Sequence, residues 1–194
     1  MKRMKKLLTG LLTLGMTLSM MTMTAFAVDA GTTTTTPKMP TIDFDTNKKG
    51  SITIHKYEYN GTGGVTGTGA DNQTPPTGAE PLAGVTFKIT KIAELDAYYG
   101  KDSGKLPSVE EAQRIAATKT DSVEKDTDAD GVATFDNLSL GLYLVQETEA
   151  PAQITGKVGD FLVSVPMTNA DEDDWLYDVH VYPKNKSTYG GVTL

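Results

Sequence analysis

The 194-residue sequence contains no cysteine, so a disulfide cannot hold the chain together. A catalytic nucleophile would have to be serine or threonine, and only two histidines are available as its base. Basic residues are also in the minority, with 18 Lys and Arg against 25 Asp and Glu and a formal net charge of -7. This acidic balance argues against nucleic acid and anionic lipid as partners. Stability must come from the hydrophobic core or from a covalent link of another kind.

Residues 1–27 have the pattern of a secretory signal peptide. A basic start is followed by an uncharged apolar run, which ends in the small-x-small sequence Ala25-Phe26-Ala27. A membrane anchor is the weaker interpretation, because Thr, Gly and Ser interrupt the run. We therefore expect a secreted protein. Removing four basic residues and no acidic ones lowers its net charge from -7 to -11.

The rest of the chain predicts a single β-rich domain over residues 41–187. A Thr-rich flexible lead-in precedes it at 28–40, and a short tail or the start of a linker follows at 188–194. Alternating segments predict strands, and a long Gly/Thr/Pro loop at 60–81 separates the first two. One helix is expected near 106–119, where Ser108 and Glu111 have capping-box spacing. The expected strands lie at 50–59, 83–92, 131–138, 140–148, 160–167 and 175–186. This pattern favours an all-β sandwich with Greek-key-like connections and one short helical excursion.

No constellation of residues predicts an enzyme. His55 and His180 both fall on the outward side of predicted strands, and no nucleophile-elbow sequence is present. We interpret both histidines as ordinary surface residues. No cofactor and no metal site are predicted.

The segment 126–137 begins like a calcium loop, with Asp126, Asp128, Asp130 and Gly131 at the expected spacing. Its twelfth position is Asn137 rather than a bidentate glutamate. The residues that follow alternate as a strand. A hairpin turn at Asp-Gly is the better interpretation, with calcium binding as the minor alternative.

Three polar residues, Lys56, Glu147 and Asn185, fall on the inward side of predicted strands. Each shares its side with apolar neighbours, which are respectively Ile52 and Ile54, Tyr143 and Val145, and Val179 and Val181. Burying such a group alone costs several kcal/mol. Each residue taken singly could instead lie at a strand end and extend to solvent.

Taken together, the three residues form a set of reagents for an intramolecular amide bond. A desolvated Lys56 would be a neutral nucleophile, and a protonated Glu147 could polarise the carboxamide of Asn185 and transfer protons. Ammonia would leave, and the first and last strands would be joined. Lys184, beside Asn185, has the opposite phase, so we expect it to be exposed and cationic.

Two motifs resemble a known family. The sequence WLYDVHVYPK is similar to the pilin motif of sortase-assembled pili of Gram-positive bacteria. The sequence YLVQETEAP at 143–151 resembles the E-box of the same proteins. The segments GSITIHKYE and PLAGVTFKI are similar to the opening strands of the N-terminal domain of a major pilin. The motif positions are Trp175, Val179, Tyr182, Pro183 and Lys184 for the pilin motif, and Tyr143, Val145, Glu147, Thr148, Ala150 and Pro151 for the E-box.

The resemblance implies an immunoglobulin-like sandwich related to the B-type domains of collagen adhesins. It also implies a structural subunit of a cell-surface pilus in the Gram-positive cell wall. A class C sortase would hold the neighbouring subunit through the threonine of its C-terminal L-P-x-T-G signal. The amine of Lys184 would then accept that subunit in an intermolecular isopeptide bond. A host surface or matrix ligand is a further candidate partner, which the Gly/Thr loop or the acidic turn at 171–174 would contact.

The sequence departs from the family pattern at two places. Gln153 and Ile154 stand where the E-box often continues with Gly-Tyr. The chain also ends at TYGGVTL without an L-P-x-T-G signal, so we expect either a fragment or a truncated product. The alternative function is a secreted adhesin-type binding module that is not polymerised.

Overall fold

The computed structural model describes residues 42, 47–59, 67–71, 73–99, 105–171 and 173–187. The predicted signal peptide (1–27), lead-in (28–40) and tail (188–194) lie outside the described residues, as does part of the predicted loop at 60–81. Among the described helices, none has the length and apolar character needed to cross a bilayer.

The described part of the chain consists mainly of strands, with two short helices. The helices are α1 (Asp96–Tyr99) and α2 (Val109–Ala116). The strands are β1 (Lys49–His55), β2 (Tyr57–Glu58), β3 (Glu80–Pro81), β4 (Thr86–Glu94), β5 (Val123–Asp126), β6 (Val132–Ser139), β7 (Gly141–Glu149), β8 (Ile154–Gly156), β9 (Phe161–Val165), β10 (Met167–Thr168), β11 (Trp175–Leu176), β12 (Asp178–Val181) and β13 (Lys184–Ser187). The predicted all-β fold is confirmed, but a single helix was too few.

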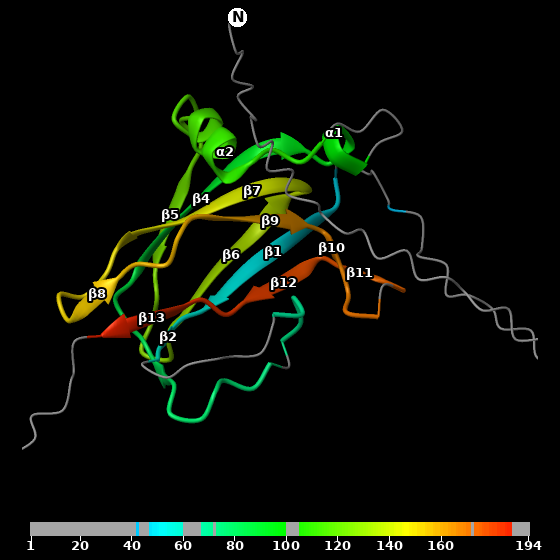
Figure 1. Cartoon of the computed structure of the whole chain (residues 1–194). Helices are drawn as coiled ribbons and strands as arrows, with labels where there is room; N and C mark the ends of the chain where they lie inside the picture. Colours follow the sequence, from blue (N-terminus) through cyan, green and yellow to red (C-terminus); the bar gives the residue numbers. More distant parts are fainter. Residues whose placement is uncertain are drawn as a thin grey trace, which may run out of the picture. The chain divides into compact units, whose positions relative to one another are not determined.

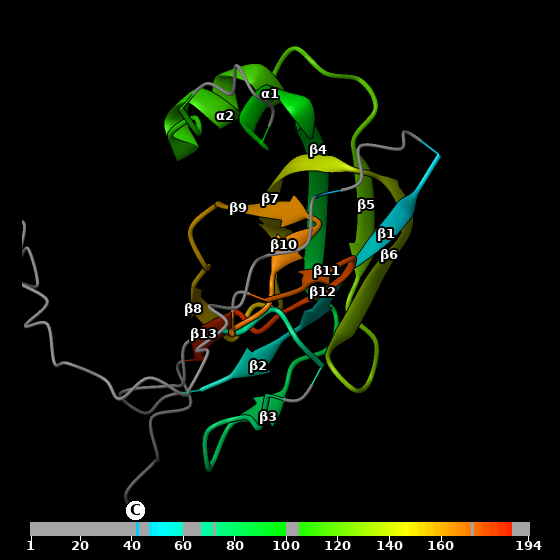
Figure 2. The same cartoon turned by 90° about the vertical axis from the view of Figure 1, so that its right-hand side faces the viewer.

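Figures 1 and 2 show two main sheets. Buried side chains of both sheets form the main core. One sheet has the strand order β12-β1-β6 and the other β5-β4-β7-β9. Strand β1 pairs with β6 in the antiparallel sense and with β12 in the parallel sense. Alternate apolar side chains of both sheets meet between them, including Ile52, Ile54, Phe87, Val145 and Val179. The residues that alternate with period 2 in the sequence therefore point inward from both sheets and form the core of the sandwich.

The larger sheet is covered on both faces. Leu144 and Ile92 point away from the main core and pack against Ala112 of α2, which Figure 1 shows beside β4 and β7. Strand β7 is therefore buried from Gly141 to Val145 without a break. A strand with two covered faces has a continuous apolar sequence rather than an alternating one.

Helix α2 begins as its sequence predicts. The Ser108 side chain accepts a hydrogen bond of 3.2 Å from the backbone N–H of Glu111, which satisfies one of the unpaired donors of the first turn. Helix α1 was not predicted. It spans four residues, and the Tyr98 hydroxyl and Ser164 Oγ of β9 are 2.9 Å apart. Tertiary contacts, rather than a periodic sequence, stabilise so short a helix.

The predicted strand at 50–59 is interrupted at Lys56, between β1 and β2. The backbone N–H of Lys56 donates to Gly131 O at 2.7 Å, and its carbonyl accepts from Leu82 N at 2.9 Å. Gly131 has φ of +73°, and a Cβ there would lie 2.4 Å from Lys56 O. Glycine is therefore required where this turn approaches Lys56.

The Asp-Gly turn predicted within 126–137 is present, because Asp128 N donates to Val132 O and Gly131 N donates to Asp128 O, each at 3.0 Å. Strand β5 pairs with β4 and strand β6 pairs with β1, so the turn carries the chain from one sheet to the other. One carboxylate oxygen of Asp128 accepts from the N–H groups of Asp130 at 3.0 Å and Val132 at 2.9 Å. This side chain closes the turn, as aspartate commonly does.

Candidate functional site

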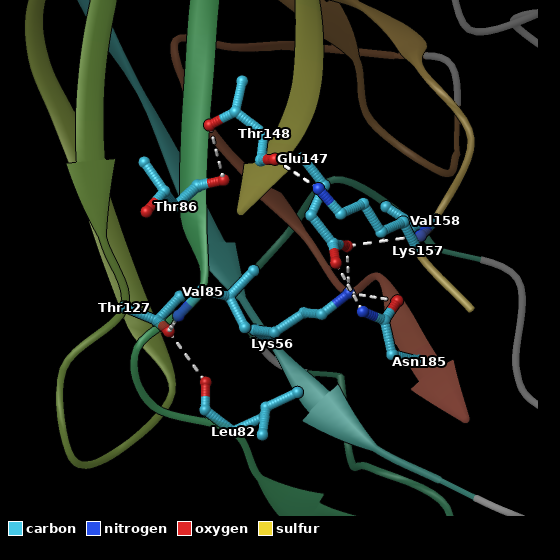
Figure 3. Close-up of polar contacts among 10 residues, drawn as sticks. All are labelled: Lys56, Leu82, Val85, Thr86, Thr127, Glu147, Thr148, Lys157, Val158 and Asn185. Carbon is cyan, nitrogen blue, oxygen red and sulfur yellow. Dashed lines mark hydrogen bonds and ion pairs between the residues drawn. The ribbon is translucent and has the colours of Figure 1, made fainter. Parts of the chain in front are cut away.

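Lys56, Glu147 and Asn185 come together in the interior, as Figure 3 shows. Lys56 lies between β1 and β2, Glu147 lies near the end of β7, and Asn185 lies in β13. The Lys56 Nζ donates to Asn185 Oδ1 at 2.7 Å and to Glu147 Oε2 at 2.9 Å. The Asn185 Nδ2 donates to Glu147 Oε1 at 2.6 Å. The three side chains form a closed triangle of hydrogen bonds.

The triangle is shielded from solvent. Lys56 is 0% exposed and Asn185 is 1% exposed. The Lys56 Nζ also lies 5.5 Å from the centre of the Phe87 ring. Burial lowers the pKa of Lys56, although its hydrogen bond and ion pair with Glu147 act in the opposite direction. Burial therefore favours the neutral amine, which is the nucleophilic form.

Glu147 connects the amine to the carboxamide. Its Oε2 accepts from Lys56 Nζ and, at 3.2 Å, from the backbone N–H of Val158, while its Oε1 accepts from Asn185 Nδ2. The N–H of Val158 fixes the orientation of the carboxyl group. Its role could not be found in the sequence, because Val158 belongs to a segment without a strand pattern. One carboxyl group thus faces both a potential nucleophile and a potential leaving group.

Lys184 lies on the other side of the same strand segment. It begins β13, opposite Tyr57 of β2, and its Nζ donates to Tyr182 O at 3.3 Å. The sequence predicted an exposed lysine, but the side chain is half-buried. The reason is a surrounding set of residues that was not foreseen, namely Tyr57, Gln73, Thr74, Pro75, Pro76 and Tyr182.

The remaining pilin-motif residues link several strands. Val179 of β12 is fully buried and pairs with Ile52 of β1. Trp175 belongs to β11, and its ring meets the Tyr99 ring of α1 edge-on at 5.3 Å. The expected continuous strand at 175–186 is divided into β11, β12 and β13, each with different partners.

The E-box residues fix β7 within the fold. Val145 is fully buried, and the Tyr143 hydroxyl donates to Ser139 O at 2.6 Å. Thr148 Oγ1 donates to Thr86 O of the neighbouring strand β4 at 3.3 Å. Ala150 and Pro151 follow the strand and are half-buried. These contacts set the position from which Glu147 enters the triangle.

The two histidines are not ordinary surface residues, so that interpretation was wrong. His55 Nε2 lies 2.8 Å from His180 Nδ1, and both are largely buried, with side chains 17% and 15% exposed. They meet because β1 and β12 run side by side in parallel, with His180 opposite Thr53. The sequence placed both histidines on outward faces, but it did not show that these two strands are neighbours.

The chain is similar to known proteins in sequence and in structure. The family model for the N-terminal domain of Gram-positive pilin subunits, D1, matches residues 47–186. The fimbrial subunit type 1 of Actinomyces viscosus is 39% identical over 181 residues, covering 89% of this chain and 32% of the relative. The fimbrial subunit type 2 of Actinomyces naeslundii is 33% identical over 164 residues, covering 74% and 30% respectively. The full-length major pilin SpaD of Corynebacterium diphtheriae is similar in structure, with a TM-score of 0.58 and 38% identity, covering 75% of this chain and 33% of SpaD.

The chain spans about a third of the length of these relatives. The family is one of structural proteins of Gram-positive surface pili, which confirms the predictions of a non-enzymatic protein and of a cell-surface location. The similarity to pilins is therefore not limited to the pilin motif and the E-box, because it covers residues 47–186. The chain belongs to the Gram-positive pilin subunits and contains their N-terminal D1 domain.

Proposed function

We propose that this chain is part of a polymerising pilus subunit whose acceptor group is the Nζ of Lys184. A class C sortase would join this amine to the C-terminal threonine of a neighbouring subunit. The observation that carries the proposal is the placement of Lys184 at the junction of β12 and β13, within a pilin motif whose other residues are packed into the domain.

The amine of Lys184 is weakly held. Its hydrogen bond to Tyr182 O, at 3.3 Å, is longer than usual for a charged donor. Lys184 is half-buried among residues that include Tyr57 and Tyr182, a setting in which a lysine stem can pack while its amine reaches solvent. A nucleophile held by its stem loses little freedom when an enzyme engages it.

The transfer step would take place on the sortase. The donor subunit would be held as a thioester on the enzyme's cysteine, and the neutral Lys184 amine would attack its carbonyl carbon. The C–N bond forms, the C–S bond breaks, and one proton of the amine passes to the departing sulfur. This chain supplies only the nucleophile and its placement.

A cavity of about 370 Å³ lies next to the pilin motif. Phe161, Met167, Val181 and Pro183 give its lining an apolar character. A short extended peptide with leucine and proline, such as a sorting signal, matches this lining better than a charged segment does. The donor segment would lie in this cavity during the transfer.

The test is a ligation assay with a class C sortase and an L-P-x-T-G peptide. The Lys184→Arg variant keeps the positive charge but has no nucleophilic amine, so labelling is expected to fall to background. Lys119→Arg serves as the matched control, because Lys119 is exposed and lies outside the motif. Equal labelling of Lys184→Arg and the parent chain would contradict the proposal.

We also propose an internal isopeptide bond between Lys56 and Asn185. The neutral amine of Lys56 would attack Cγ of Asn185 and pass one proton to Glu147 Oε2. The carboxamide C–N bond then breaks, and the nitrogen leaves as ammonia after receiving a proton from the Glu147 carboxyl group. The triangle of hydrogen bonds supports this sequence, because Oε2 faces the amine and Oε1 faces the leaving nitrogen.

The two proposed bonds would lie next to each other in the chain. A force applied at Lys184 would reach Asn185 at once and pass through the isopeptide bond to Lys56, which follows β1. It would not have to be carried by the hydrogen bonds between β13 and its neighbours. This arrangement is suited to a subunit in a fibre under tension.

A further inference from the structure

His55, His180 and Asp71 form a cluster that the polymerisation chemistry does not use. Each offers one donor atom, and these atoms lie within 4.8 Å of one another. Asp71 Oδ1 is 3.3 Å from His180 Nδ1 and 3.7 Å from His55 Nε2. We propose that these three side chains bind a divalent transition-metal ion of the zinc type.

The distances fit a tetrahedral site. Metal–nitrogen bonds of about 2.0–2.1 Å at tetrahedral angles place two ligand atoms roughly 3.3 Å apart. The two separations that involve Asp71 are already close to this length. The two histidine nitrogens are 2.8 Å apart, the distance of a hydrogen bond. A rotation that separates them by about half an ångström, with the bridging proton moved to the other ring nitrogen of the donating histidine, would convert the hydrogen-bonded pair into a pair of ligands.

The donor set selects the class of metal. Two imidazoles and one carboxylate suit zinc and its neighbours, whereas calcium and magnesium prefer oxygen ligands throughout. The Asp71 side chain is 73% exposed, so the ion could enter from solvent and keep water as a fourth ligand.

Neighbouring groups already hold the ligands in place. The Tyr182 ring stacks on the His55 ring, with centres 4.6 Å apart and planes inclined by 9°. The Tyr182 hydroxyl donates to Ala70 O at 3.1 Å, and the backbone N–H of His180 donates to Gly69 O at 2.8 Å. The loop that carries Asp71 is therefore fixed to the pilin motif before any ion binds. Fixed ligands reduce the ordering cost of binding.

A bound ion would join three segments that are far apart in sequence. His55 ends β1, His180 lies in β12, and Asp71 precedes the loop residues 73–76 that surround Lys184. The ion would thus act as a clip between the first strand, the pilin-motif strand and this loop. The inference does not depend on Lys184 being the acceptor, because it concerns different side chains.

The test uses the purified chain without a histidine tag, titrated with zinc by calorimetry and with cobalt by visible absorption. We expect one ion per chain and the absorption bands of tetrahedral cobalt. Asp71→Asn and His180→Asn should each weaken binding about tenfold or more, because even the loss of a supporting residue commonly costs that much. At a free zinc concentration about a hundred times Kd, the Tm of the parent chain should rise by roughly 5–10 °C.

Two controls distinguish loss of the metal site from nonspecific metal binding and from misfolding. Asp130→Asn also removes an exposed carboxylate, but in the turn between β5 and β6, and should leave binding unchanged. Asp71→Asn affects an exposed side chain, so its folding should equal that of the parent chain. Absence of one-to-one binding by the parent, or equal affinity of the parent and Asp71→Asn, would overturn the proposed site. Equal weakening by Asp130→Asn would do so as well.

Discussion

Lys184 and Asn185 are consecutive residues of β13 with opposite surroundings. The Lys184 amine donates to Tyr182 O at 3.3 Å in a half-buried position, whereas Asn185 is 1% exposed and bound to Lys56 and Glu147. The alternation of a strand separates a reachable amine from a shielded carboxamide within one residue. The two proposed covalent bonds depend on this relationship.

The first prediction concerns the intact mass of the purified chain. Formation of the Lys56–Asn185 bond should reduce the mass by one ammonia, because the carboxamide nitrogen leaves. Lys56→Met and Glu147→Ala should keep the full mass calculated from their sequences, since they lack the nucleophile and the proton relay respectively. An intact mass equal to the calculated one for the parent chain would exclude the bond.

Asn185→Asp provides a matched control for that measurement. An aspartate would form the same bond with Lys56 and release water instead of ammonia. The linked product would therefore have the same mass as the linked parent chain. A mass one water higher would show that the carboxamide is needed for the reaction.

The second prediction concerns stability. Lys56→Met keeps an apolar stem but removes the bond that would connect residues 129 positions apart. Closing a loop of that length stabilises a fold by about 5 kcal/mol in the chain-entropy model. The free energy of unfolding should therefore fall by about 5 kcal/mol in chemical denaturation.

The comparison for this variant is Lys119→Met, in which an exposed lysine of the segment after α2 is changed in the same way. Surface changes of this kind usually alter stability by less than about 0.5 kcal/mol. Similar denaturation midpoints for Lys56→Met and Lys119→Met would argue against a stabilising role of the triangle.

The third prediction concerns pH and the unlinked lysine. Asn185→Ala removes the acceptor carbon, so Lys56 keeps a titratable amine whose pKa burial lowers from its usual 10.5. Between the folded-state pKa and 10.5, the unfolded chain binds more protons than the folded chain. The free energy of unfolding should therefore rise with pH in this window.

The double variant Asn185→Ala/Lys56→Met isolates this effect, because other lysines and tyrosines titrate equally in both proteins. The unfolding free energy of Asn185→Ala minus that of the double variant should increase as the pH is raised toward 10.5. A difference that stays constant, or that decreases, would contradict a lowered pKa of Lys56.

Much of the fold could be predicted because its signals are local. The apolar alternation of Ile52 and Ile54 predicted β1, and the spacing of Ser108 and Glu111 predicted the start of α2. The phase of Lys56 along the same strand also indicated a buried amine. Such patterns depend only on neighbours within one element.

The rest depends on contacts between distant segments. The parallel pairing of β1 with β12 brings His55 beside His180, 125 residues away, and no local pattern specifies it. The half-buried state of Lys184 depends on the loop at 73–76, whose sequence indicates only a turn-rich segment. The orientation of Glu147 depends on the backbone N–H of Val158, which every residue except proline offers.

The most direct test of the central claim is tandem mass spectrometry of the sortase-ligated product. After digestion, the peptide containing Lys184 should carry the threonine of the donor signal on its ε-amine, with one water lost overall relative to the free peptides. The neighbouring Lys186 and the buried Lys56 should remain free of donor. A donor threonine attached to any lysine other than Lys184 would contradict the account.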